Sequence, residues 1–214
     1  NSIRRNLFNL TFTDSSFPRM RTFISANSLF QIQPVSEWSP ILESFGPRYC
    51  QIFSRPPHRE QVTEAQYAKY LMKIMAVKSG QVLVLTTEGK GVGLFVGMPL
   101  SNRYFDRGVN LSSEKEILEQ RLYEDLVRIL NDLYFLTFHQ VDLVIDAEWQ
   151  GKGIGKDFLE AAVTMTPNGF SCVTGLVHDQ NGPMKKLLHA CRFRYLGVQR
   201  RDASEGSINF RNVV

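Results

Sequence analysis

The chain has few cysteines and no paired cysteine motif. Its three cysteines, Cys50, Cys172 and Cys191, are odd in number and far apart, so they lack the CxxC spacing of zinc and redox sites. We therefore expect reduced, mostly buried thiols and no metal site. Reduced thiols favour a cytoplasmic compartment.

Long hydrophobic runs are also missing. No stretch approaches the roughly 18 apolar residues that a membrane-spanning helix needs, so the chain is not expected to cross a membrane. Hydrophobic residues make up 43% and charged residues 21% of the 214 residues, which excludes disordered and collagen-like classes. This length and composition predict one well-buried domain.

The positive charge is concentrated near the N-terminus. Residues 1–28 contain four arginines and one aspartate, so this segment carries +3 of the net charge of +4. A nucleic-acid-binding protein would concentrate Lys and Arg along one element of its folded part, so no nucleic-acid partner is expected. We treat residues 1–28 as an extension of unknown role and residues 29–214 as the domain.

Hydrophobic periodicity predicts an α/β (α+β) domain with helices and strands intermixed around one sheet. Expected strands are residues 30–33, 81–86, 92–96, 135–145, 171–177, 195–199 and 207–212, with helices from about residue 38, at 62–77, 153–164 and 182–190. Residues 81–96 read as a hairpin around the turn at residues 88–91. A further amphipathic helix falls within residues 100–134, which form an insertion.

A glycine-rich segment at residues 150–156 follows the strand that ends at Ile145 and opens a helix. Glycine lets the backbone amides approach a ligand closely, and a helix N-terminus attracts anions. A Walker A loop would require glycine at Gln150 and Ser or Thr at Asp157, and a dinucleotide fingerprint would require glycine at Lys156. Neither pattern fits, although a pyrophosphate would suit this turn.

The remaining pattern, Gln150-x-x-Gly153-x-Gly155 after Leu143-Val144-Ile145-Asp146, resembles the Q/R-x-x-G-x-G/A motif of the GNAT acetyltransferases. The stretch from Asn181 to Phe193 is similar to the N-x-x-A-x-x-L-Y-x-x-x-G-F helix of that family, with Asn181, Leu187 and Phe193 in register. The resemblance spans residues 29–212 and is specific over residues 141–193. It implies a single GNAT-type domain with a mixed sheet of about six or seven strands flanked by helices.

The resemblance also implies that the chain is an N-acetyltransferase, with acetyl-CoA as co-substrate and direct attack by an amine in a ternary complex. The implied acyl-CoA-binding residues are Leu143, Val144, Ile145, Gln150, Gly151, Lys152, Gly153, Ile154, Gly155, Lys156, Asn181, Lys185 and Leu188. The acceptor would be an amine on a small molecule, peptide or protein. The insertion at residues 100–134 is a candidate for part of the substrate pocket or for a homodimer interface.

The catalytic groups are less well indicated than the acyl-CoA turn. The usual general acid of the family is a tyrosine, and Leu188 occupies its position. His139 and Asp142 lie on the strand that enters the motif, and both are candidate general bases, although an ordinary structural histidine is an equally good reading of His139. His58 and His178 have no partner pattern in the sequence. Two alternatives therefore stay open, an acyl-CoA-binding module with reduced catalysis and a GNAT-fold transferase with another acyl donor.

Overall fold

The computed structural model describes residues 20–99, 137–170, 172–178, 180–202 and 205–213. The elements, in chain order, are β1 (Arg21–Ser25), β2 (Ser28–Val35), α1 (Pro40–Phe53), α2 (Glu64–Met75), β3 (Gln81–Thr87), β4 (Lys90–Pro99), β5 (Thr137–Ile145), the 3-10 turn η1 (Ala147–Trp149), α6 (Ile154–Thr164), β6 (Cys172–His178), α7 (Gly182–Ala190), β7 (Arg194–Asp202) and β8 (Glu205–Val213). The predicted insertion at residues 100–134 lies outside the described residues.

The described strands form one mixed sheet in the order β1-β2-β3-β4-β5-β6-β8-β7. Every neighbouring pair is antiparallel except β5 and β6, which run parallel. The mixed sheet of the prediction is confirmed, with eight strands in place of six or seven. The additional strand is β1, which pairs with β2 from Arg21 to Ser25, so this part of the segment 1–28 belongs to the sheet.

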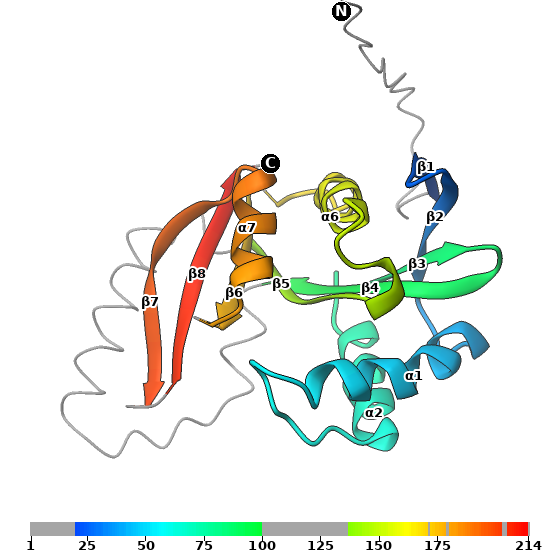
Figure 1. Cartoon of the computed structure of the whole chain (residues 1–214), viewed down its shortest axis with the longest axis horizontal. Coiled ribbons are helices and arrows are strands. Elements are labelled where there is room, and N and C mark those ends of the chain that lie inside the picture. Colours follow the sequence, from blue (N-terminus) through cyan, green and yellow to red (C-terminus); the bar gives the residue numbers. More distant parts are fainter. Residues whose placement is uncertain (1–19, 100–136, 171, 179, 203–204, 214) are drawn as a thin grey trace, which may run out of the picture.

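Helices cover both faces of the sheet (Figure 1). Alternation along β3 sends Val82 and Val84 to one face and Leu83 and Leu85 to the other, because successive side chains of a strand point in opposite directions. The first face packs against α1 and α2, and the second packs against α6 and α7. Both sides of the central strands are thereby buried, which explains their continuous apolar sequence.

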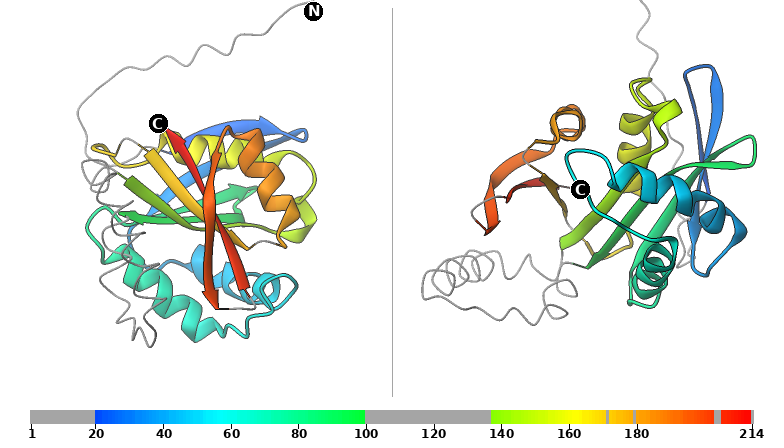
Figure 2. Two further views of the ribbon diagram at one scale, coloured as in Figure 1. Left: turned by 90° about the vertical axis from the view of Figure 1, so that its left-hand side faces the viewer. Right: turned by 60° about the horizontal axis from the view of Figure 1, so that its bottom comes forward.

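The two ends of the sheet differ in strand direction. Figure 2 shows β7 and β8 running across the direction of β3 and β4, as the twist of a large sheet requires. The change occurs at the parallel pair β5–β6, where residues 137–140 pair with residues 172–175 and the strand pairing then ends. Beyond this point β5 and β6 leave an opening, which we call the β5–β6 opening and which lies between residues 141–145 and 176–178.

A β-bulge lies at the start of this opening. Val96 pairs with Asp142 and Gly97 with Gln140, so Val141 is an extra residue on β5. Val141 and Val144 both pack toward α1 and α2, whereas Leu143 and Ile145 pack toward α6. A bulge bends its strand and increases the local twist, which gives a physical reason for β5 to part from β6 at this residue.

The helices and the hairpin predicted from periodicity are present at nearly the predicted bounds. Helix α2 begins with a capping box in which the Thr63 hydroxyl accepts from the Gln66 amide at 3.2 Å. Asn181 caps α7, its side-chain oxygen accepting from the backbone N–H of Met184 at 3.1 Å. No helix in the described ranges is long and apolar enough to cross a membrane.

Candidate functional site

The β5–β6 opening exposes one edge of β5 in the middle of the sheet. Residues 142–145 remain paired with β4 on one side, whereas their pairing with β6 on the other side ends at Gln140 and Gly175. Buried backbone N–H and C=O groups require partners, and an extended ligand can supply them by lying alongside the strand. The opening is therefore a place where a chain-like ligand could bind between two strands.

The opening leads into the glycine-rich turn. Gly151 and Gly153 have φ values of +74° and +84°, and a Cβ built on either glycine would meet no atom within 4 Å. Backbone hydrogen bonds in this turn include those from Trp149 N to Asp146 O, from Gln150 N to Ala147 O and from Lys156 N to Gly153 O. The amides of residues 151–155 precede or begin α6, where backbone N–H groups have no partner within the helix and are available as donors.

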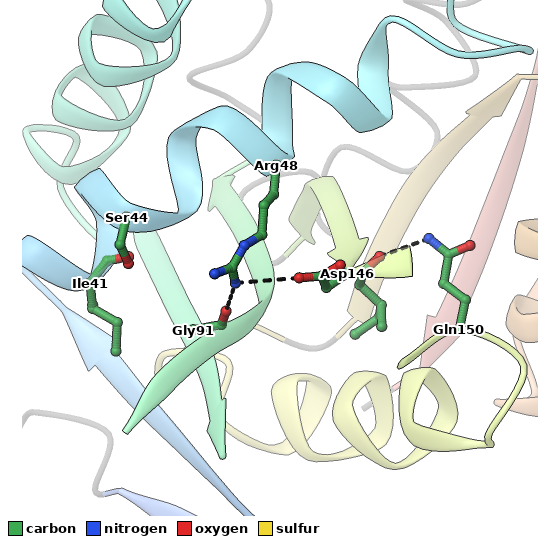
Figure 3. Close-up of polar contacts among 7 residues, drawn as sticks. Ile41, Ser44, Arg48, Gly91, Asp146 and Gln150 are labelled. Atoms are coloured by element: carbon green, nitrogen blue, oxygen red, sulfur yellow. Dashed lines mark hydrogen bonds and ion pairs between the residues drawn. The ribbon is translucent and has the colours of Figure 1, made fainter. Parts of the chain in front are cut away.

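Two side chains fix the end of β5 from opposite directions (Figure 3). The Gln150 amide donates to the Ile145 carbonyl at 2.8 Å. The Arg48 guanidinium, on α1, donates to the Gly91 carbonyl at 2.6 Å and lies 3.3 Å from the Asp146 carboxylate. The position of the turn is thus set by α1 and β4 as well as by the motif itself.

The N-terminus of α6 packs against α7, so the two motif halves meet in space. A Cβ built on Gly155 would lie 3.6 Å from Leu187, which is ordinary van der Waals contact. The Cys191 thiol donates to the Lys156 carbonyl, with a sulfur–oxygen distance of 3.9 Å. Burial, followed by the nearby Glu160 carboxylate, raises the pKa of Cys191 to about 12, which keeps the thiol protonated as a donor.

The remaining predicted ligand residues surround this junction. Lys152 extends over the Trp149 ring, with its Nζ 4.7 Å from the ring centroid, and Lys156 lies 3.8 Å from Glu160 within α6. Lys185 lies half-buried on α7. Leu188 is fully buried at 0% exposure among the residues that join α6, α7 and the sheet. A leucine in that position offers no hydrogen-bond donor.

The structure separates the two candidate bases on β5. His139 is 2% exposed, lies where β5 and β6 are still paired, and has its Nδ1 3.0 Å from the Thr174 hydroxyl. Asp142 lies at the opening, and its Oδ2 accepts from the hydroxyls of Tyr49 and Tyr70, each at 2.8 Å. Two tyrosine hydroxyls therefore already occupy this carboxylate oxygen. The assignment of His139 and Asp142 as bases stays a prediction, since no observation here tests it.

Burial, and next the Asp142 carboxylate, raise the pKa of Tyr49 far above its ordinary value. Tyr49 therefore remains a hydroxyl donor throughout the working pH range, and the two tyrosines join α1 and α2 to β5. Periodicity predicts the helix that carries Tyr70 but cannot pair that tyrosine with a carboxylate on a distant strand.

A pair of histidines that the sequence left without partners also lies at the opening. His58, in the loop between α1 and α2, is 6.2 Å from His178, at the end of β6, measured between ring centroids. The two positions are 120 residues apart in the chain, so no local sequence pattern predicts that they lie close together.

The fold is thus a mixed sheet whose two parallel central strands part beside a glycine-rich helix N-terminus. Comparison with solved structures agrees. The chain is similar to an N-acetyltransferase from Staphylococcus aureus Mu50, with a TM-score of 0.58 and 12% identity over 85% of this chain and 98% of the other. It is also similar to an acetyltransferase of the GNAT family from Streptococcus pneumoniae, with a TM-score of 0.53 and 12% identity over 86% and 99% of the two chains.

A third similar structure is described as an acetyltransferase from Salmonella typhimurium with its cofactor acetyl-CoA. The TM-score is 0.57 and the identity 11%, over 85% of this chain and 93% of the other. No family model matches the chain, and no curated protein matches it in sequence. The chain therefore has the fold of the GNAT acetyltransferases at an identity too low to transfer a substrate.

Proposed function

We propose that this protein is an acyl-CoA-dependent N-acyltransferase that moves an acetyl group from acetyl-CoA to an amine. The observation that carries the proposal is that the unpaired edge of β5 is followed directly by the glycine-rich turn at residues 150–156. The similar Salmonella typhimurium structure, described with acetyl-CoA, supports the choice of co-substrate. The proposed compartment is the cytoplasm, and the acceptor is a small molecule, peptide or protein that carries an amine.

The turn fits a pyrophosphate group. Gly151 and Gly153 leave open space where other residues would place a Cβ, the amides of residues 151–155 supply donors, and the dipole of α6 favours negative charge. The edge of β5 at Leu143 and Ile145 would then hold the pantetheine arm through backbone hydrogen bonds. Acetyl-CoA would supply an activated thioester carbonyl at the β5–β6 opening.

The reaction requires positioning more than covalent catalysis. The amine nitrogen forms a bond to the acetyl carbonyl carbon, the carbon–sulfur bond breaks, and CoA leaves as its thiol. A neutral amine loses one proton to a base, and the leaving thiolate takes up one proton, so the reaction conserves protons. Leu188 cannot supply the second proton, because its side chain has no donor.

Leu188 is also the observation that favours a second candidate, an acyl-CoA-binding module with reduced catalysis. A GNAT-fold transferase with another acyl donor is the third reading. The three candidate functions share the same nucleotide-binding site, but they differ in the acyl group that is bound and in whether it is transferred. Binding and transfer therefore have to be measured separately.

Isothermal titration with acetyl-CoA, free CoA and longer acyl-CoAs tests the nucleotide site. Gly153→Asp should abolish binding, because it places a carboxylate where the pyrophosphate would lie. Gly169→Asp is the matched control. Gly169 also has positive φ, at +98°, and open space around its Cβ, but it lies beyond the other end of α6. Full binding by Gly153→Asp, or no binding by the wild-type protein, would contradict the proposal.

Thiol release across a panel of amines then distinguishes the readings. Release with acetyl-CoA supports the acetyltransferase, and release with only a longer acyl-CoA supports the third reading. Tight binding without release from any acyl-CoA supports the binding module. A panel of aliphatic amines, arylalkylamines, amino acids and lysine-containing peptides covers the proposed acceptor classes.

A further inference from the structure

One wall of the β5–β6 opening consists of aromatic and imidazole rings from three separate elements. Tyr49 and Phe53, on the last turns of α1, stack with ring centroids 4.5 Å apart. Phe53 lies 4.9 Å from the His58 ring, and His58 lies 6.2 Å from the His178 ring. Because Tyr49 donates to Asp142 on β5 and His178 ends β6, this wall reaches both sides of the opening.

The register of the sheet relates His178 to the proposed pantetheine path. Residues 137–140 face residues 172–175 across the parallel pair, and His178 lies three residues further along β6, beside the part of β5 that follows the Val141 bulge. Val177 packs toward α6, so His178, the next residue on the strand, faces the α1–α2 side. The two imidazoles thus lie beside the point where the acyl group would emerge between the strands.

We propose that His58 is the general base that takes the proton from the acceptor amine, and that His178 positions it. This inference rests on the proposed function, because it concerns the acceptor half of the same site. As the amine nitrogen bonds to the acetyl carbon, one N–H proton passes to the His58 imidazole, and the carbon–sulfur bond then breaks to release CoA. The imidazolium returns the proton to the leaving thiolate or to solvent.

The surroundings of His58 suit a base that works at neutral pH. Burial, the largest effect, lowers its pKa and outweighs the Glu60 carboxylate, which raises it, while His178 lowers it and Asp142 raises it by smaller amounts. The imidazole is therefore neutral at pH 7 and able to accept a proton. Tyr49 and Tyr70 add no competing charge, because they face Asp142 as hydroxyl donors.

His178 differs from His58 in its hydrogen bonding. Its Nδ1 accepts the backbone N–H of Gln180 at 3.2 Å, so in the neutral ring the proton is carried by Nε2. That bond fixes the ring at the end of β6. His178 therefore acts through His58 as a positioning residue, whereas His58 would touch the reacting amine.

The first test uses His58→Gln, His178→Gln and the control His189→Gln, which changes an exposed histidine on α7. All three should bind acetyl-CoA with wild-type affinity by titration. With an amine found in the panel, His58→Gln should lower kcat/KM roughly 100- to 1,000-fold and remove the acid limb of the pH profile. Added imidazole should restore part of the rate to His58→Ala.

His178→Gln should move the acid limb to higher pH, because it removes a neighbour that lowers the pKa of His58. A merely structural residue would lower the rate without moving the limb. If His58→Gln keeps both the wild-type kcat/KM and the acid limb while binding acetyl-CoA, the inference is wrong and the proposed function stands. If the wild-type protein does not bind acetyl-CoA, the proposed function itself fails.

A second test does not depend on knowing the acceptor. The chain has only four histidines, so their imidazole NMR signals can be assigned by single substitutions. Acetyl-CoA should shift the signals of His58 and His178, whereas adenosine 3′,5′-bisphosphate, which lacks the pantetheine arm, should leave both unchanged. Binding of acetyl-CoA without a shift at His58 would overturn the inference.

Discussion

The side-chain amide of Gln150 donates a hydrogen bond to the carbonyl of Ile145 at 2.8 Å, which closes the connection between the end of β5 and the turn before α6 (Figure 3). Gln150 is exposed, so this bond contributes little to the core. Its effect is geometric, because it holds the residues that follow in the position from which their amides point outward. The motif glutamine thus acts on the backbone of the turn.

Replacing Gln150 with alanine should therefore weaken acetyl-CoA binding more than it weakens folding. We expect the melting temperature to fall by at most about 2–4 °C, as for the loss of one exposed hydrogen bond of about 1 kcal/mol. The acetyl-CoA dissociation constant should rise by roughly tenfold, because the donors of the turn are no longer held in place. Gln51→Ala on α1, also exposed, is the control, and equal affinities for the two variants would refute this role.

The two motif glycines of the turn, Gly153 and Gly155, should respond differently to replacement by alanine. Gly153→Ala forces a side chain into the left-handed region at φ +84°, which costs about 1 kcal/mol and should lower the melting temperature by roughly 2–4 °C. Gly155 does not have positive φ, and its built Cβ makes only ordinary contact at 3.6 Å. Gly155→Ala should leave stability and acetyl-CoA affinity near the wild-type values.

Differential scanning calorimetry and titration of both variants check this contrast. The comparison also tests the motif reading, since the GNAT pattern allows glycine or alanine at the second of these positions. If the Gly155→Ala protein melts at a temperature well below that of Gly153→Ala, a methyl group at residue 155 clashes in the packing between α6 and α7.

The two tyrosine hydroxyls on Asp142 should contribute to stability together. Tyr70→Phe removes one donor to a charged acceptor and should cost about 1.5–3 kcal/mol in the free energy of unfolding. Tyr49→Phe should cost a similar amount. Because both hydroxyls bind the same oxygen, the double variant should not be additive. Urea unfolding of the singles and the double measures this coupling, and strict additivity would mean that the two bonds are independent.

His58 predicts a pH dependence of stability as well as of activity. Its folded-state pKa lies below the unfolded value of 6.5. As the pH falls through 6.5, the unfolded chain therefore binds more protons at this residue than the folded chain does. Stability from this group should therefore be fully present above pH 6.5 and decline toward the lowered folded pKa, with a slope of at most about 1.4 kcal/mol per pH unit. Denaturant unfolding from pH 8 to 5 should show a shallower decline for His58→Gln than for His189→Gln, and equal declines would exclude this linkage.

The sequence by itself determined the elements whose signals are local. The apolar runs of β3 and β4 with their turn, and the amphipathic pattern of α2, depend on residues within a few positions of one another, and the structure places these elements close to the predicted bounds. The glycine turn belongs to the same class, because positive φ at Gly151 and Gly153 is a local requirement. The fold class followed from their order along the chain.

Only the tertiary structure decided which distant side chains meet. The bulge at Val141 and the end of pairing at Gly175 arise from the packing of three strands, and no pattern along β5 alone marks them. Helices α1 and α2 and their connecting loop fold over one face of the sheet. This arrangement brings Arg48 into an ion pair with Asp146 and lets Tyr49 and Tyr70 donate to Asp142. It also places the ring of His58 near the ring of His178. Side-chain pairing across 70 or more residues depends on that arrangement in space, so periodicity and motifs could identify the nucleotide turn but not the acceptor half of the site.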